Sequence, residues 1–190
     1  MERTSAKVVI AGGFGAGKTT LVGAVSEVPP LTTEEVMTEA SVGVDDLAGL
    51  EAKTRTTVAL DFGRITITGD VVLYLFGTPG QDRFWFMWDE LAQGALGAVV
   101  LVDTRRLPAS FASVDYFERR GIPFVVAVNA FYGECAYTDD EIRSALQLKP
   151  EVPLARCDAR RRDSALAVLI GLLRHVLSGL PAAPPVPAVP

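Results

Sequence analysis

The hydrophobic positions of this chain fall into short apolar runs separated by longer amphipathic stretches. Apolar runs of strand length lie at 8–10, 58–67, 71–76, 98–102, 124–128 and 152–155. Several are continuous rather than alternating, which is typical of strands buried on both faces. Helical patterns lie between most of them, at 18–27, 84–91, 108–120, 139–148 and 163–180. Strands that alternate with helices predict a parallel sheet covered by helices, an α/β fold.

One pair of strands departs from this alternation. Only Gly69 and Asp70 separate the run 58–68 from the run 71–76. Gly-Asp between two strand-like runs is typical of a tight hairpin, so one antiparallel edge strand is expected. The predicted architecture is a three-layer sandwich around a mostly parallel six-stranded sheet. Thr138 or Asp139, with Glu141 soon after, predicts a helix start.

The first apolar run leads into a glycine-rich segment with the spacing of a phosphate-binding loop. Residues 12–19 read Gly-Gly-Phe-Gly-Ala-Gly-Lys-Thr, and a helical pattern follows. Glycines let the backbone N–H groups curl around a phosphate, Lys18 supplies positive charge, and the Thr19 hydroxyl is suited to Mg²⁺. The helix adds its positive dipole end to the same place. The predicted nucleotide-binding residues here are Gly13, Phe14, Gly15, Ala16, Gly17, Lys18, Thr19 and Thr20.

Composition narrows the class of protein. The 190 residues are 49% hydrophobic, which fits one compact domain over 1–180 with a large core. Residues 181–190 contain five prolines and are expected to form an extended, disordered tail. The net charge of −5 argues against nucleic-acid binding. Two cysteines without metal-like spacing, no secretory leader and no apolar run of membrane-spanning length predict a cytoplasmic protein that meets membranes only through partners.

A segment before the hairpin resembles the first switch of Ras-superfamily proteins. Residues 57–62 read Thr-Val-Ala-Leu-Asp-Phe. The resemblance implies that Thr57 closes over the γ-phosphate and ligates Mg²⁺ together with Thr19. Arg55, two residues earlier, could supply a catalytic cation in cis. The plainer alternatives are a β-forming threonine at a strand start and a surface arginine.

The segment after the hairpin resembles the second switch of small GTPases. Residues 75–84 read Leu-Phe-Gly-Thr-Pro-Gly-Gln-Asp-Arg-Phe. The resemblance implies that Gly80 offers its N–H to the γ-phosphate and that Gln81 orients the attacking water. Gly77 replaces the aspartate that usually reaches Mg²⁺ through water, so the ion depends on the two threonines unless Asp61 or another carboxylate takes part. Phe14 stands where Ras has glycine and crowds the entry of an arginine from a partner, so slow hydrolysis is expected.

The motifs expected to contact the nucleotide base disagree about guanine specificity. Residues 129–133 read Asn-Ala-Phe-Tyr-Gly, where small GTPases have Asn-Lys-x-Asp. Asn129 fits and Phe131 could stack on the base, but Tyr132 lacks the two carboxylate oxygens that accept from guanine. The run 156–160 resembles the Ser-Ala-Lys loop and makes Cys157, Asp158 and Ala159 nucleotide-binding candidates, with the Ala159 N–H directed at guanine O6. This loop favours GTP and GDP, and Tyr132 opposes them.

Together these motifs resemble the GTPase component of actinobacterial conservons, which is related to the gliding-motility GTPases. The resemblance covers about residues 5–180 and implies three partners: a roadblock/LC7-type dimer, a sensor kinase and a small regulatory protein. The residues also predict a docking surface in the run Trp85, Phe86, Met87 and Trp88, because a helix cannot bury every side of such a run. Phe84, Trp88 and Leu91 could face the sheet, which would leave Trp85 with Phe86 or Met87 outward. The alternative is a helix wedged between the sheet and its neighbours.

Two other functions fit parts of the sequence. Gly77, Phe14 and Tyr132 would suit a pseudo-GTPase scaffold that binds nucleotide with little hydrolysis or relaxed base specificity. A small P-loop kinase or ATPase is the second alternative. Gln81 and the lack of an arginine-rich lid argue against it, and a preference for adenine would favour it.

Overall fold

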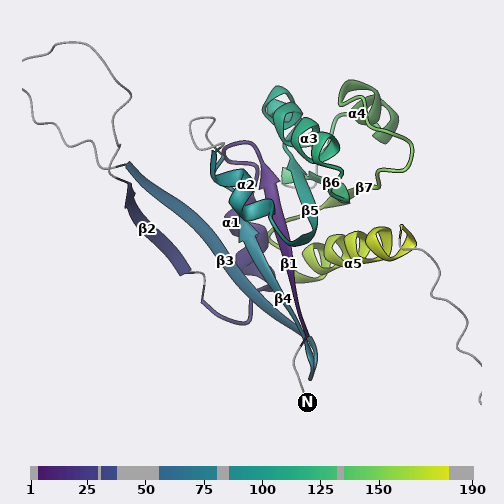
Figure 1. Ribbon diagram of the computed structural model, residues 1–190. Helices are drawn as coiled ribbons and strands as arrows, with labels where there is room; N and C mark the ends of the chain where they lie inside the picture. Colours follow the sequence, from purple (N-terminus) through teal and green to yellow (C-terminus); the bar gives the residue numbers. More distant parts are fainter. Residues whose placement is uncertain (1–3, 30, 38–55, 81–85, 132–134, 180–190) are drawn as a thin grey trace, which may run out of the picture.

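The computed structural model describes residues 4–29, 31–37, 56–80, 86–131 and 135–179. Its strands are β1 (Thr4–Gly12), β2 (Leu31–Met37), β3 (Thr56–Thr68), β4 (Val71–Gly77), β5 (Ala95–Val102), β6 (Phe124–Asn129) and β7 (Leu154–Cys157). Its helices are α1 (Lys18–Val25), α2 (Phe86–Ala92), α3 (Pro108–Arg120), α4 (Asp139–Ala145) and α5 (Arg162–Ser178), with a short 3-10 helix, η2 (Thr104–Arg106). Figure 1 shows these elements around one twisted sheet.

The described strands form one sheet in the order β2-β3-β4-β1-β5-β6-β7. The pairs β1–β4, β1–β5, β5–β6 and β6–β7 are parallel, whereas β3 runs antiparallel to both β2 and β4. The predicted α/β fold class and the hairpin are therefore confirmed. The sheet gains a seventh strand, β2, so the antiparallel strand β3 lies one position in from the edge. The sequence of β2, Leu-Thr-Thr-Glu-Glu-Val-Met, has no alternating apolar pattern that would have predicted it.

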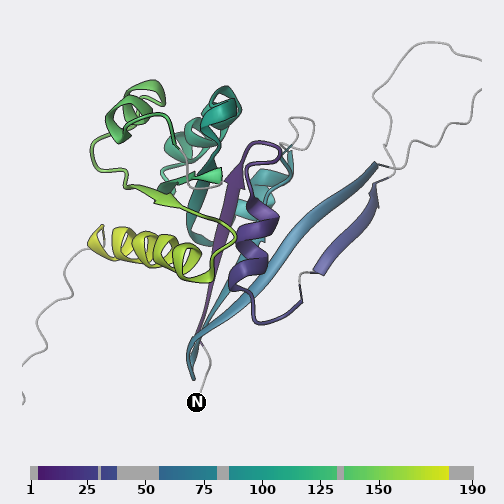
Figure 2. The same cartoon turned by 180° about the vertical axis from the view of Figure 1, so that it is seen from behind.

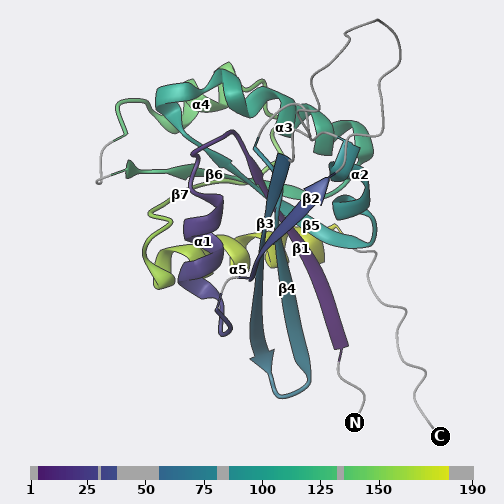
Figure 3. The same cartoon turned by 90° about the vertical axis from the view of Figure 1, so that its left-hand side faces the viewer.

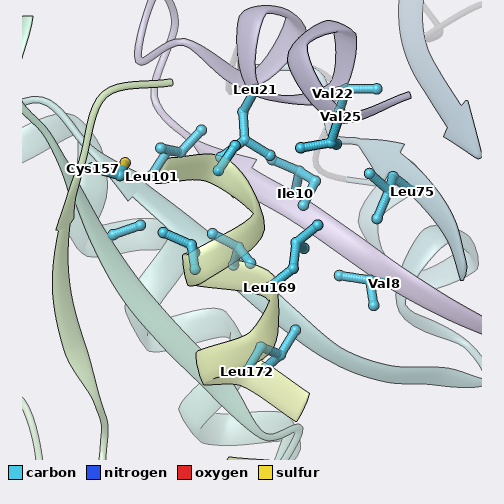
Figure 4. Close-up of a cluster of buried hydrophobic side chains, with 14 of the residues drawn as sticks. Val8, Ile10, Leu21, Val22, Val25, Leu75, Leu101, Cys157, Leu169 and Leu172 are labelled. Atoms are coloured by element: carbon cyan, nitrogen blue, oxygen red, sulfur yellow. The ribbon is translucent and has the colours of Figure 1, made fainter. Parts of the chain in front are cut away.

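One face of the sheet is covered by α1 and α5. Leu21, Val22 and Val25 of α1 are fully buried against apolar side chains of β1, β4 and β5. They belong to one apolar cluster with Leu169 and Leu172 of α5 (Figure 4). Gly63 in β3 permits the close approach of α1, because a Cβ there would lie 2.7 Å from a Val22 methyl carbon. Figure 2 shows α1 in front of the sheet.

The other face is covered by α2, α3 and α4. Its core is rich in aromatic side chains. The ring centroids of Trp88 in α2 and Phe117 in α3 are 5.9 Å apart, and those of Phe117 and Phe124 in β6 are 6.1 Å apart. Helix α4 completes this layer and begins as expected, with a capping box in which the Thr138 hydroxyl accepts from the Glu141 N–H. Helices on both faces of the sheet make the three-layer sandwich that the sequence predicted.

Basic side chains from distant elements cap the carboxyl ends of α1 and α2. Arg162, at the start of α5, donates to the Val25 carbonyl at 2.8 Å. Lys7 of β1 donates to the carbonyls of Glu90 and Gln93 at 3.2 and 3.0 Å. Cations are favourable at this end of a helix because its last carbonyls lack partners and carry partial negative charge. The helix after the phosphate loop is thereby tied to the last helix of the fold.

The carboxyl ends of the parallel strands gather at one edge of the sheet. The phosphate loop follows β1 there, and Asp103, Asn129 and Asp158 follow or end β5, β6 and β7. The β3–β4 turn lies at the opposite end (Figure 3). In open parallel sheets, ligands bind beyond the carboxyl ends of the strands. Within the described residues, no helix has both the length and the apolarity needed to cross a bilayer.

Candidate nucleotide-binding site

The loop between β1 and α1 has the backbone geometry that a phosphate cradle requires. Gly12, Gly15 and Gly17 have φ angles of 138°, 77° and 104°, values that residues with a Cβ rarely adopt. A Cβ on Gly17 would also lie 2.6 Å from the side-chain nitrogen of Asn129. Helix α1 then begins at Lys18, so its first N–H groups belong to the same loop. The glycines are therefore needed both for the curl of the loop and for its close packing.

Lys18 lies within this loop rather than in solvent. Its Nζ donates to the carbonyls of Gly12 and Gly13 at 2.9 and 2.8 Å, and the residue is 8% exposed. Burial lowers the pKa of the ammonium group to about 8, and the charge of Asp61 acts in the opposite direction. A positive charge that has few waters around it interacts strongly with an arriving phosphate.

Asp61 of β3 fills the space that a side chain on Gly77, the position of the aspartate in small GTPases, would occupy. The two residues are paired across β3 and β4, and a Cβ on Gly77 would lie 2.8 Å from both Cβ and Oδ2 of Asp61. The Thr19 hydroxyl donates to Asp61 Oδ2 at 2.8 Å, and Asp61 is 8% exposed. The carboxylate is thus supplied from the neighbouring strand and is directed at the phosphate loop.

This donor set fits Mg²⁺. A carboxylate and a hydroxyl are the hard oxygen ligands that the ion prefers, usually alongside substrate phosphates and water. The described residues include no cluster of three or more His, Cys, Asp or Glu side chains suited to a metal. Thr19 and Asp61 would therefore hold Mg²⁺ in combination with phosphate oxygens, and the ion would neutralise phosphate charge. Thr57, the other predicted ligand, pairs with Val36 in the sheet, and its side chain is not among those described.

The residues after β4 lie directly on the phosphate loop. A Cβ on Gly80 would lie 2.8 Å from Lys18 Nζ and 2.9 Å from the backbone nitrogen of Phe14. The Phe14 ring itself is 66% exposed. A group bound by Lys18 would therefore meet Gly80 as well. Gln81 and Arg55, the predicted catalytic residues of the two switches, lie outside the described residues.

Asn129 connects three loops at the carboxyl edge of the sheet. Its Nδ2 donates to the Ala16 carbonyl at 3.0 Å, and its Oδ1 accepts from the Ala159 N–H at 3.1 Å. Asn129 and Ala159 are 6% and 1% exposed. The structure therefore brings together the predicted bracing residue, the phosphate loop and the loop after β7. The Ala159 N–H, which was predicted to meet guanine O6, already has a partner.

The loop after β7 is stabilised by an aspartate–arginine pair. Both oxygens of Asp158 accept from the Arg160 side chain, at 2.9 and 2.7 Å. Hydrogen bonds from Arg160 lower the pKa of Asp158 to about 2. The neighbouring Cys157 is buried, and burial raises its thiol pKa to about 12, so it is neutral and unreactive at physiological pH. Tyr132, the remaining base-end candidate, lies outside the described residues.

Sequence reasoning missed two residues beside Asn129. Asp103 and Arg105, together with Phe131, Tyr137 and Asn129, line a pocket of about 460 Å³. Asp103 is 7% exposed, and Arg105 lies over the Phe131 ring, 3.8 Å from its centroid. A signal was available: Asp103 directly follows a continuous apolar strand, and charged residues at the carboxyl ends of parallel strands are candidates for ligand contact.

The aromatic docking surface predicted on α2 is wrong for two of its residues, because their side chains are buried. Met87 and Trp88 are 9% and 3% exposed. Trp88 packs into the layer between α2, α3 and the sheet. Both residues are therefore core residues and do not form an exposed surface. Phe86 is 58% exposed, and Trp85 lies outside the described residues. Of the predicted partner-binding residues that the structure describes, Phe86 alone is well exposed.

A glycine-rich loop between a strand and a helix, with its lysine inside the loop, defines a P-loop nucleotide-binding protein with a GTPase-like fold. Residues 10–179 match the model of a family described as conserved hypothetical ATP binding protein, and the chain belongs to this family. It is 30% identical over 131 residues to the uncharacterized protein MJ1339 of Methanocaldococcus jannaschii, an alignment that covers 68% of this chain and 72% of that protein.

The fold is also similar to a solved structure. The G domain of the T. maritima FeoB iron transporter superposes with a TM-score of 0.57, covering 92% of this chain and 98% of that domain. The two sequences are 16% identical, so this similarity concerns the fold.

Proposed function

We propose that the protein is a GTP/GDP-binding, Mg²⁺-dependent molecular switch. The observation that carries the proposal is the contact of β3 and of the segment after β4 with the phosphate loop and the start of α1. Asp61 of β3 accepts from Thr19, and Gly80, just after β4, lies against Lys18. A γ-phosphate bound by Lys18 would add contacts to both segments, and its loss would remove them. Ordering and release of two segments by one phosphate is the usual basis of a nucleotide switch.

Guanine is the proposed base, although the family description names ATP. The support is the likeness of the motifs to small GTPases, and above all Asn129, which braces the phosphate loop through Ala16. Adenine is the competing base, and any binding test must compare the two.

The proposed hydrolysis is slow. Gln81 would orient water, Lys18 and Thr57 would hold the phosphate and Mg²⁺, and Arg55 would supply a cation in cis. The pseudo-GTPase scaffold is the alternative. Asp61 weakens one argument for that alternative, since a carboxylate is present beside Thr19 even though residue 77 is glycine.

The proposed biological setting is bacterial signal transduction in a system of the conservon type. The partners would be a roadblock/LC7-type dimer, a sensor kinase and a small regulatory protein. Phe14 and Phe86, which are 66% and 58% exposed, support a docking surface beside the nucleotide. The protein would reach a membrane only through these partners.

The test is a competition titration with a fluorescent guanine nucleotide against GTP, GDP, ATP and ADP, with Mg²⁺ and again with EDTA. Displacement by guanine nucleotides alone supports the proposal, and equal displacement by ATP contradicts it. Lys18→Ala is expected to abolish binding, since it removes the buried cation of the loop. Phosphate release under multiple turnover then separates a slow GTPase from a scaffold.

A further inference from the structure

A pocket of about 760 Å³ lies at the end of the sheet opposite the phosphate loop. Its walls come from the amino ends of β5 and β6, the carboxyl ends of α3 and α5, and the residues before β7. Because α3 and α5 cover opposite faces of the sheet, the pocket opens between the two helix layers. A group bound there would lie at the other end of the strands from Lys18 and the nucleotide.

The floor of this pocket is apolar and continuous with the core. Phe124, Val152 and Val176 line it and are 4%, 4% and 8% exposed. Leu96 and Ile122 also line it, and they are only partly buried where they pack on the two core clusters. Removing their remaining apolar surface from water would be favourable. The core is therefore open at this end and suited to an apolar occupant.

The chain itself leaves the described structure at this pocket. Ser178 and Gly179, the last two described residues, both line it. The Gly179 N–H donates to the carbonyls of His175 and Val176 at 3.3 and 3.2 Å, so the last turn of α5 closes at the pocket wall. Eleven residues, 180–190, follow Gly179 in the sequence. They need no linker to reach the pocket.

Residues 180–190 have a composition that suits an apolar pocket. They read Leu-Pro-Ala-Ala-Pro-Pro-Val-Pro-Ala-Val-Pro, so every side chain is apolar and none is charged. Because proline fixes φ and lacks an N–H, such a segment favours the extended polyproline conformation and loses little conformational entropy on docking. A sphere of 760 Å³ is about 11 Å wide, so three or four residues at about 3.1 Å each would cross it.

We propose that residues 180–190 dock back into this pocket, with their apolar side chains on its floor. The carbonyl groups of a polyproline segment have no partners within the segment. Lys149 and His175, which line the pocket, supply N–H donors for them. An uncharged segment also brings no repulsion to Glu118 and Glu151, which line the same pocket. The proposal does not depend on the proposed function, since it concerns the opposite end of the strands.

The point of attachment favours this segment over a partner or a second copy of the chain. A segment that begins at the pocket wall has an effective concentration of about millimolar at the pocket. Weak contacts are then enough to keep the pocket filled by its own chain. A separate molecule would have to displace the segment before it could bind.

The test measures backbone order in the full chain by ¹⁵N relaxation. Six residues of the segment carry an N–H and serve as probes: Leu180, Ala182, Ala183, Val186, Ala188 and Val189. A docked segment is expected to give order parameters close to about 0.85 at Ala182, Ala183 and Val186, and a free segment values below about 0.6. Nuclear Overhauser effects from the Val186 methyl groups to Ile122 or Leu96 then identify the pocket.

Ile122→Asp is the decisive variant, because it places a charge on the apolar wall. It is expected to lower the order parameters of the segment below about 0.6 and to leave nucleotide binding unchanged. Ile170→Asp is the matched control, since Ile170 is 48% exposed on α5 and does not line the pocket. The segment should stay ordered in this control. Lys149→Ala, at an exposed position of the rim, should also lower the order parameters and serves if Ile122→Asp does not fold.

A labelled peptide of residues 180–190 gives an independent measurement. It should bind the full chain carrying Val186→Asp and Val189→Asp at least about tenfold more tightly than the unmodified chain, whose pocket is already filled. Equal binding to the two chains would contradict the proposal.

Three outcomes of the relaxation experiment overturn the proposal. The first is a segment with order parameters below about 0.6 in the unmodified chain. The second is order that rises with protein concentration, since the segment of one copy would then lie in the pocket of another. The third is an ordered segment that neither Ile122→Asp nor Lys149→Ala releases. Nucleotide binding by Lys18→Ala bears only on the proposed function, so the two proposals fail separately.

Discussion

Removing the charge of Asp61 should weaken the dependence of nucleotide binding on Mg²⁺ more than it weakens the fold. Asp61→Asn keeps the shape of the side chain and an oxygen that accepts from the Thr19 hydroxyl, which now lies 2.8 Å from Oδ2. A buried hydrogen bond to a charged acceptor contributes about 1.5–3 kcal/mol, and only the part due to the charge is lost. Loss of a group that hydrogen-bonds a metal ligand, as Asp61 does with Thr19, typically lowers metal affinity by about 10–100-fold. The variant should therefore fold normally and need about 10–100 times more Mg²⁺.

The assay is the retention of a fluorescent guanine nucleotide as Mg²⁺ is titrated from an EDTA-buffered baseline. Asp70→Asn, at the far turn of the same hairpin, is the control and should leave the midpoint unchanged. The charge of Asp61 also raises the pKa of Lys18, so Asp61→Asn should shift the pH dependence of binding to lower pH. An unchanged Mg²⁺ midpoint in Asp61→Asn would refute the reasoning.

A relocated carboxylate provides a stricter version of this test. Gly77→Asp alone should impair binding, because its Cβ would lie 2.8 Å from Asp61 and the two carboxylates would repel each other. The double variant Asp61→Gly with Gly77→Asp moves the carboxylate to the neighbouring strand and should recover part of the Mg²⁺ response. If Gly77→Asp alone behaves like the unmodified chain, the two residues do not share one space.

Three other predictions follow from the geometry. Nucleotide affinity should be constant below a pH of about 8 and fall above it, because the protonated form of Lys18 binds phosphate and its pKa is lowered to about 8; Kd values from pH 6.5 to 9.5 check this. Gly17→Ala should lose nucleotide binding and about 1–3 kcal/mol of stability in thermal melts, because φ of Gly17 is 104° and a Cβ there would collide with Asn129. Gly171→Ala in α5, where a Cβ meets open space, should be neutral or stabilising in the same melts. Trp88→Ala should cost about 3–5 kcal/mol and Phe86→Ala less than about 0.5 kcal/mol in chemical denaturation; equal losses would contradict the burial of α2.

The sequence predicted the fold well where one signal was enough. Continuous apolar runs identify strands buried on both faces, and Gly69-Asp70 identifies the hairpin. Boundaries were less accurate: α1 was expected over 18–27 and is Lys18–Val25, and the strand expected over 152–155 is Leu154–Cys157. Edge strand β2 was missed because a strand with one open edge needs little apolar patterning.

The part of the candidate site that lies in one continuous segment of the sequence could be predicted. The phosphate loop follows from the spacing of its glycines and Lys18. The role of Asp61 depends on register, since only the pairing of β3 with β4 places it beside Gly77. Asp103 was missed because its contact with Phe131 is made through Arg105 and joins two different strands. Helical spacing allowed Trp88 to face the sheet and Phe86 or Met87 to face outward. Trp88 is 3% and Phe86 58% exposed, whereas the burial of Met87 depends on the orientation of α2.

The hydrogen bond from Arg162 to the carboxyl end of α1 determines when the site can be completed during synthesis of the chain. Arg162 lies 137 residues after Val25, whose carbonyl it binds, and Asn129 lies 113 residues after Ala16. A nascent chain on the ribosome therefore holds its phosphate loop long before it holds the residues that brace it. The loop and the helix after it gain these two hydrogen bonds only once Asn129 and Arg162 have emerged and docked. Nucleotide bound at that moment would stabilise a finished chain and give a half-made one no advantage.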